Sequence, residues 1–238
     1  MQPHKIKIQL KRTSIMKLLF SIALIISGLS LANANDDLVM QAGVVSDYVF
    51  RGISQTDNHP ALQGGIEYRH SKGLYAGFWA SSIDLPSGSD IETDSYFGYS
   101  SEIKSSNIGW DIGYVVYRYN ESADNFEELY GSLSLDVAPT VTFIGKISRD
   151  PDNKATVAEA MGIFKLPRDI NFKVRPGLVD RPGSAGDYRF FQLAAGINLP
   201  LNSFARNIDL EISFSDTDID ARSSRTETIW WVSALAHF

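Results

Sequence analysis

The sequence predicts an all-β fold: an antiparallel transmembrane β-barrel of about twelve strands, preceded by a cleaved N-terminal signal peptide. Three observations lead to this prediction. A short apolar run lies near the N-terminus, apolar and polar side chains alternate along most of the remaining chain, and turn-forming residues interrupt the alternation at regular intervals. A helical membrane protein with several spans is excluded, because it would need several apolar runs of about 18 or more residues.

The N-terminal segment has the three parts of a secretory signal. Met16 is the expected initiator, Lys17 supplies the positive charge, and residues 18–31 form the apolar run. Residues 32–34 (Ala-Asn-Ala) match the small-residue cleavage pattern. The basic residues before Met16 are either an extended n-region or a mis-called start. A retained anchor helix is disfavoured, because the run is shorter than the about 18 residues expected of a spanning helix.

These features divide the chain into a signal peptide at residues 1–34 and a barrel domain at residues 35–238. Five of the 22 basic residues and none of the 28 acidic ones precede residue 35, so the formal charge falls from −6 for the full chain to −11 for the domain. A domain with this much negative charge lacks the basic surface that nucleic-acid binding needs. The sequence contains no Cys, which excludes disulfides, thiol catalysis and Cys-ligated metal centres.

Alternation is the strongest signal after residue 35, and it gives each predicted strand two different faces. Ile108, Trp110 and Ile112 lie on one face of their strand and Asp111 lies on the other. Residues 154–165 are the weakest strand prediction, because their Ala-rich sequence also fits a short helix. Turn signals delimit twelve strands, at residues 38–53, 61–70, 74–83, 92–103, 108–119, 125–137, 140–149, 154–165, 170–180, 188–199, 207–217 and 225–238.

Two all-β architectures fit such strands. A soluble sandwich buries its apolar faces, whereas a transmembrane barrel turns them outward to lipid and its polar faces into the lumen. The strand lengths, the even strand number and the aromatic residues near strand ends favour the barrel. The outer aromatic girdle is predicted to contain Phe50, Phe191, Phe214 and Trp230.

The C-terminal strand carries the most specific local pattern. Trp230 and Val232 alternate with other residues up to a terminal Phe238. This ending resembles the signature by which outer-membrane barrels are recognised for insertion, although Ala236 stands where an aromatic residue is commoner. We therefore expect two partners: the lipid of the outer membrane, and the barrel-assembly machinery, which would bind this strand.

Residues 45–56 (VSDYVFRGISQT) are the most distinctive stretch of the chain, followed by residues 60–68 (PALQGGIEY) and 73–81 (GLYAGFWAS). Together they resemble the TorF-type porin family of proteobacteria, and the resemblance extends from about residue 38 to the C-terminus. It implies an outer-membrane barrel with a pore in a Gram-negative bacterium. It implies no particular substrate and no catalytic residues.

Arg51 is the most prominent candidate for the lumen. It has two interpretations: it lines a constriction with Asp47 and Glu67 as counter-charges, or it forms a structural ion pair with Gly52 as a bulge or bend. The structural ion pair is favoured. The complete set of candidate lumen-lining residues is Asp47, Arg51, Glu67, Asp111, Glu128, Lys146, Glu159, Lys173, Arg175, Asp209 and Glu211.

Catalytic and metal chemistry finds little support. Asp216 to Asp220 with Glu227 match the acidic positions of a calcium loop, but Ala221 replaces the required Gly. We predict no catalytic residue, metal or cofactor, because the few His residues do not form a recognisable motif with a nucleophile. The expected function is passive diffusion of small hydrophilic solutes. The alternatives are a non-conducting structural or surface-binding barrel and, with less support, a membrane-embedded hydrolase.

Overall fold

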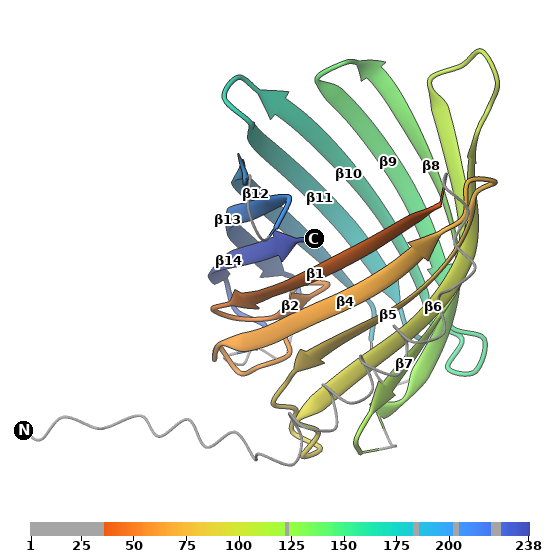
Figure 1. Ribbon diagram of the computed structural model, residues 1–238. Coiled ribbons are helices and arrows are strands. Elements are labelled where there is room, and N and C mark those ends of the chain that lie inside the picture. Colours follow the sequence, from red (N-terminus) through yellow and green to blue (C-terminus); the bar gives the residue numbers. More distant parts are fainter. Residues whose placement is uncertain (1–35, 122–123, 183–185, 202–204, 220–224) are drawn as a thin grey trace, which may run out of the picture. The chain divides into compact units, whose positions relative to one another are not determined.

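The computed structural model describes residues 36–121, 124–182, 186–201, 205–219 and 225–238 (Figure 1). The predicted signal peptide lies outside the described residues, and so do residues 220–224 of the acidic segment that resembles a calcium loop. Across the described residues, the structure contains no helix with the length and hydropathy that crossing a membrane would require.

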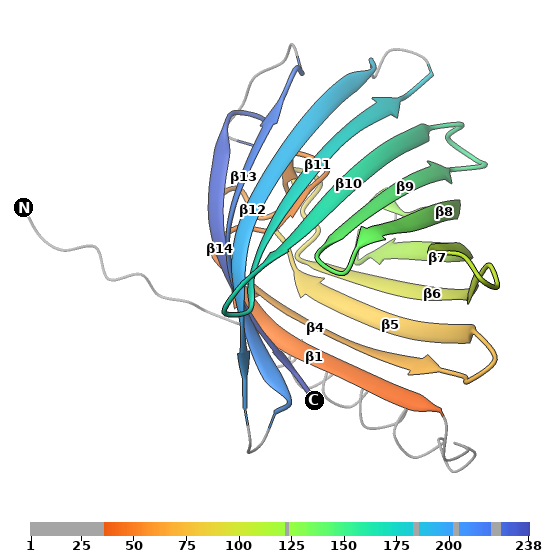
Figure 2. The ribbon, with the colours of Figure 1, turned by 90° about the horizontal axis from the view of Figure 1, so that it is seen from above.

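Twelve long strands form one closed antiparallel barrel (Figures 1 and 2). Each strand pairs with its neighbours in the chain, and β1 closes the barrel by pairing with β14 on one side and β4 on the other. The twelve-stranded barrel predicted from the alternation is therefore confirmed. The strands are β1 (Asp37–Val45), β4 (Ala61–Arg69), β5 (Leu74–Ser82), β6 (Ile91–Glu102), β7 (Ile108–Tyr119), β8 (Phe126–Ala138), β9 (Val141–Arg149), β10 (Thr156–Leu166), β11 (Ile170–Asp180), β12 (Tyr188–Pro200), β13 (Asn207–Thr217) and β14 (Ile229–His237).

The faces of the strands are arranged as in a membrane barrel. Ile112, Leu133 and Ile147 are 54%, 60% and 61% exposed on the outer surface. Glu92 and Glu128 lie on the inward faces of their strands and are almost completely buried. Apolar side chains outside and charged ones inside are the reverse of a soluble protein. The sandwich alternative is therefore wrong.

The connections distinguish the two ends of the barrel. The shortest ones, at residues 139–140 and 167–169, lie at the end where β1 begins and β14 finishes. The longest ones, at residues 46–60 and 218–228, lie at the other end. Short turns of outer-membrane barrels face the periplasm. We therefore assign the first end to the periplasm and refer to the second as the outer end.

The structure shows which conformation residues 156–166 adopt and where the C-terminal strand lies. Residues 156–166 form β10, paired with β9 and β11, so the helix considered for this segment is wrong. The C-terminal residues form β14, and the backbone N–H of Phe238 donates to the Met40 carbonyl at 2.9 Å. Trp230 and Val232 point outward, with exposed fractions of 65% and 53%. The C-terminal strand thus closes the barrel, while its recognition by assembly machinery stays a prediction.

The first predicted strand, residues 38–53, is wrong in its second half. The strand β1 ends at Val45, where Ser46 N–H donates to the Val232 carbonyl, and the chain then turns into the barrel. Phe50 is therefore not part of an outer aromatic girdle. Its ring lies inside, with its centroid 6.0 Å from that of the inward-facing Tyr117.

Candidate functional site: a loop folded into the lumen

Residues 46–60, the inward loop, connect β1 to β4 at the outer end of the barrel. They contain a small hairpin made of β2 (Val49–Phe50) and β3 (Ile53–Ser54). Arg51 and Gly52 form its two-residue turn, both with positive φ, at 49° and 83°. Positive φ at both positions is the mark of a type I′ turn, whose twist matches that of the paired strands. Gly52 is thus part of a tight turn rather than a strand bulge.

The inward loop contacts widely separated parts of the barrel wall. Near its start, the ring of Tyr48 packs edge-on against Trp79 of β5, with centroids 5.4 Å apart. At its tip, Gly52 lies against Phe190 of β12 and Thr217 of β13. Because β5 and β12 are far apart in the strand order of a closed barrel, the loop lies across the lumen.

Apolar packing holds the tip of the loop in place. Ile53 packs against a buried cluster made of Val157, Val179, Tyr188 and Phe190 on the inner wall. A side chain at Gly52 would bring its Cβ to 2.9 Å from Phe190 Cβ and into a clash with Thr217. Only glycine therefore allows both the turn and this close contact.

Arg51 makes the strongest polar contact of the loop. Its Nη1 and Nη2 donate to the two carboxylate oxygens of Glu128 on β8, at 2.7 and 2.9 Å, and both side chains are less than a tenth exposed. Burial alone lowers the pKa of Arg51, but the hydrogen bonds and charge of Glu128 outweigh it and raise that pKa, so the guanidinium stays charged. The partner of Arg51 is Glu128. It is neither Asp47 nor Glu67, the counter-charges of the constriction interpretation, and Glu67 instead pairs with Arg69.

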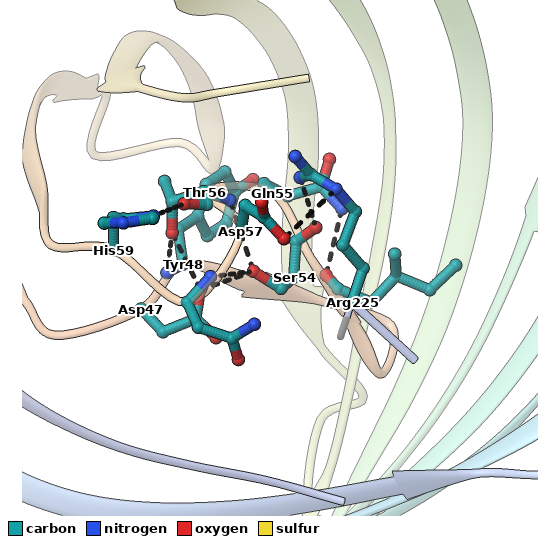
Figure 3. A network of polar contacts seen from close by, with 10 residues as sticks. Asp47, Tyr48, Ser54, Gln55, Thr56, Asp57, His59 and Arg225 are labelled. Atoms are coloured by element: carbon teal, nitrogen blue, oxygen red, sulfur yellow. Dashed lines mark hydrogen bonds and ion pairs between the residues drawn. The ribbon is translucent and has the colours of Figure 1, made fainter. Parts of the chain in front are cut away.

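Asp47 organises the base of the inward loop (Figure 3). Its Oδ1 accepts hydrogen bonds from Ser54 Oγ at 2.6 Å and from Thr56 Oγ1 at 2.7 Å. Thr56 Oγ1 in turn accepts the backbone N–H of Tyr48, and Ser54 Oγ accepts that of Asn58. Asp47 therefore stabilises the fold of the loop rather than the charge of Arg51.

The loop is also connected to its neighbours at the outer end. The Gln55 carbonyl accepts the Asp84 N–H at 2.8 Å, and Ser54 N–H donates to the Arg225 carbonyl at 2.9 Å. Arg225 also lies 3.7 Å from the Asp57 carboxylate (Figure 3).

Burial, together with the charges of Glu92 and Asp94, raises the pKa of Tyr48, which therefore stays protonated.

Below the loop, the remaining candidate residues lie on inward-facing positions and form separate groups. Lys173 pairs with Glu211 at 2.6 Å, and Arg175 pairs with Glu159. Asp209 accepts a hydrogen bond from the Asn198 amide near the periplasmic end. Among the described residues, no three His, Asp or Glu side chains converge as a metal site would require.

The last two candidates, Asp111 and Lys146, lie next to tyrosines that are not among the predicted lumen residues. Asp111 accepts a hydrogen bond from Tyr75 Oη at 2.7 Å, and Lys146 Nζ lies 4.1 Å from the ring centre of Tyr130. A partial sequence signal was available, because a glycine follows Tyr75 and Tyr96 at a spacing of two residues, on the same face of the strand.

Comparisons with known proteins agree with this architecture. The model of a family described as bacterial protein of unknown function (Gcw_chp) matches residues 32–175, more than half of the chain. The chain belongs to the Gcw_chp family. The match includes the whole inward loop and its partner Glu128. No curated protein is significantly similar to this Gcw_chp chain.

Solved structures show the same fold for this Gcw_chp protein. The KdgM porin in complex with disordered oligogalacturonate superposes with a TM-score of 0.61 at 9% identity, covering 85% of this chain and 99% of that one. The NanC porin superposes with a TM-score of 0.55 at 9% identity, covering 84% and 98%. The barrel fold is thus that of outer-membrane porins.

Proposed function

We propose that this protein is an outer-membrane channel for passive diffusion of small hydrophilic solutes, of the TorF porin type. The observation that carries the proposal is a closed barrel whose outer surface is apolar and whose charged lumen is crossed by a loop fixed on a buried ion pair. Such a loop narrows the path and sets an upper limit on solute size. The similarity to KdgM, solved with an oligogalacturonate, supports passage of hydrophilic molecules.

A non-conducting structural barrel is the second candidate. The contacts between the inward loop and several parts of the wall favour it, because they would also suit a permanent plug. A hydrolase has less support. His237 Nε2 lies 3.1 Å from Asp209 Oδ2, but Asp209 also accepts the amides of Asn198 and Asn207, as expected of a structural cluster.

The charges at the outer end predict a weak preference for cations. Exposed carboxylates there include Asp84, Asp90, Glu121, Asp152 and Asp218. They raise the local cation concentration within a Debye length, about 8 Å at physiological salt. Reversal potentials across a KCl gradient should therefore show cation selectivity that fades as salt increases. Anion selectivity at low salt would contradict this, and would assign selectivity to Lys146, Lys173 and Arg175 in the lumen.

The proposal also requires export through the general secretory pathway. Protein produced in a Gram-negative host should begin near Asn35 and fractionate with outer membranes, because residues 1–34 have the pattern of a cleaved signal. N-terminal sequencing of the membrane fraction measures this. Retention of Met16 in the folded, membrane-inserted protein would contradict the cleavage.

A further inference from the structure

Three tyrosines form a continuous ledge on the lumen wall between β5 and β8. In the strand register, Tyr96 lies opposite Gly77, Tyr75 opposite Gly98, and Tyr130 opposite Gly113. A Cβ on any of these glycines would clash with the tyrosine opposite; at Gly113 it would lie 2.6 Å from the Tyr130 ring. Each phenol ring therefore covers a bare stretch of backbone on the neighbouring strand, and we call these three side chains the tyrosine ledge.

The edges of the rings are fixed by hydrogen bonds. Tyr75 Oη donates to Asp111 Oδ1 at 2.7 Å and is also hydrogen-bonded to Tyr130 Oη. The rings of Tyr75 and Tyr96 follow one another with centroids 6.4 Å apart. All three side chains are only partly buried although they face inward. Rigid rings that are covered on the wall side and partly exposed are flat apolar surfaces within a polar lumen.

Polar groups surround the tyrosine ledge on its periplasmic side. A hollow of about 400 Å³ is lined by Ser100, Ser132 and Ser134 together with Glu102, Trp110 and Asp111, and Asp111, the acceptor of the Tyr75 hydroxyl, connects it to the ledge. On the β9 side of the ledge, Lys146 Nζ lies over the Tyr130 ring. Among the described residues, Lys146 makes no ion pair. Hydroxyls, a carboxylate and an ammonium thus border the rings.

We infer that the tyrosine ledge is a binding site for saccharides as they pass through the channel, an inference that rests on the proposed function. A pyranose ring has a flat face of C–H groups and a rim of hydroxyls. The C–H face fits the partly exposed aromatic surface, whose negative quadrupole attracts the slightly positive hydrogens. The hydroxyl rim fits Asp111 and the serine hydroxyls. Covering of glycines by aromatic side chains also stabilises sheets, but that role requires neither the neighbouring hydroxyl and carboxylate groups nor the partial exposure of the rings to the lumen.

The test compares cellotriose, a saccharide with flat pyranose rings, with sorbitol, an acyclic polyol with the same hydroxyl chemistry. Binding is measured in two ways: by interruption of the ion current in planar bilayers, and by calorimetry on the refolded full chain in detergent. We examine Tyr96→Phe, which keeps the ring, and Tyr96→Leu, which still covers Gly77 without a flat aromatic face. Tyr99→Leu on the opposite face of β6 is the matched control.

The wild type and Tyr96→Phe should bind cellotriose alike and more tightly than sorbitol. Tyr96→Leu should bind cellotriose roughly three- to tenfold more weakly, as expected for the loss of one aromatic contact, and Tyr99→Leu should match the wild type. Equal binding of cellotriose and sorbitol by the wild type would overturn the inference, and so would unchanged binding by Tyr96→Leu. If Tyr96→Leu does not refold, the inference is tested by the cellotriose affinity of Tyr130→Leu and by the preference of the wild type for cellotriose over sorbitol.

The two readouts separate this inference from the proposed function. Conduction without cellotriose-specific binding would overturn the tyrosine ledge and leave the channel intact. Cellotriose-specific, ring-dependent binding in calorimetry without conduction would support the ledge as a binding site and contradict the channel.

Discussion

Replacing Glu128 by Gln should release the inward loop from the lumen. The change leaves the Arg51 guanidinium buried without its counter-charge, which typically costs about 3–5 kcal/mol. Movement of the loop out of the lumen would return the Arg51 charge to water. It requires little rearrangement of the barrel, because Arg51 lies at the tip of a short hairpin. Trypsin should then cut after Arg51, which is only 7% exposed in the native loop, and the denaturant midpoint of the barrel should fall.

The neighbouring Glu127 offers a matched control. It lies on the opposite face of β8, 4.0 Å from the half-exposed Arg118, and an exposed pair of this kind contributes at most about 1 kcal/mol. Glu127→Gln should leave Arg51 protected. The double variant Arg51→Gln, Glu128→Gln removes both charges and should recover much of the lost stability. Continued protection of Arg51 in Glu128→Gln would show that packing at Ile53 and Gly52, rather than the ion pair, retains the loop.

Replacing Ile112 by Arg should destabilise the protein in lipid by roughly 2–4 kcal/mol, because a charge would face the hydrocarbon near the membrane midplane. Ile112 is 54% exposed on the outer surface. The control is Ser132→Arg, whose side chain enters the lumen beside Asp111, its cross-strand partner. Refolding equilibria in lipid vesicles measure both variants. Equal costs for the two would contradict the assignment of the faces.

The strands could be predicted from the sequence because lipid and lumen impose a period of two on every spanning segment. Ile112 and Asp111 are neighbours in the chain, and their chemistry alone distinguishes the outer face from the inner one. The Ala-rich β10 follows the same rule despite its composition, because its backbone groups must pair with β9 and β11 in the membrane.

The inward loop could not be predicted in the same way. Residues 48–53 keep a strand-like composition, since they do form short strands, but these pair with each other instead of with the barrel. The Arg-Gly pair between apolar residues was a local sign of a two-residue hairpin turn. The partner Glu128 had no local sign, because it lies 77 residues away and is brought to Arg51 by closure of the barrel.

The tyrosine ledge also depends on contacts between distant parts of the chain, which local sequence does not predict. Alternation places Tyr75, Tyr96 and Tyr130 on inward faces, but the fit of each ring over a glycine depends on the register between strands. Register is fixed by the turns and by the closed barrel as a whole. The alternation is therefore sufficient to assign these residues to a face, but not to predict what they form together.

Single-channel conductance of the refolded protein in planar bilayers, with Glu128→Gln measured beside the wild type, tests the central claim most directly. A channel narrowed by the inward loop predicts small, discrete current steps for the wild type. It predicts clearly larger steps for Glu128→Gln, whose loop no longer crosses the lumen, and wild-type steps for Glu127→Gln. A folded wild type that gives no steps, together with a Glu128→Gln variant that gives none either, would contradict the channel and favour a barrel with a closed lumen.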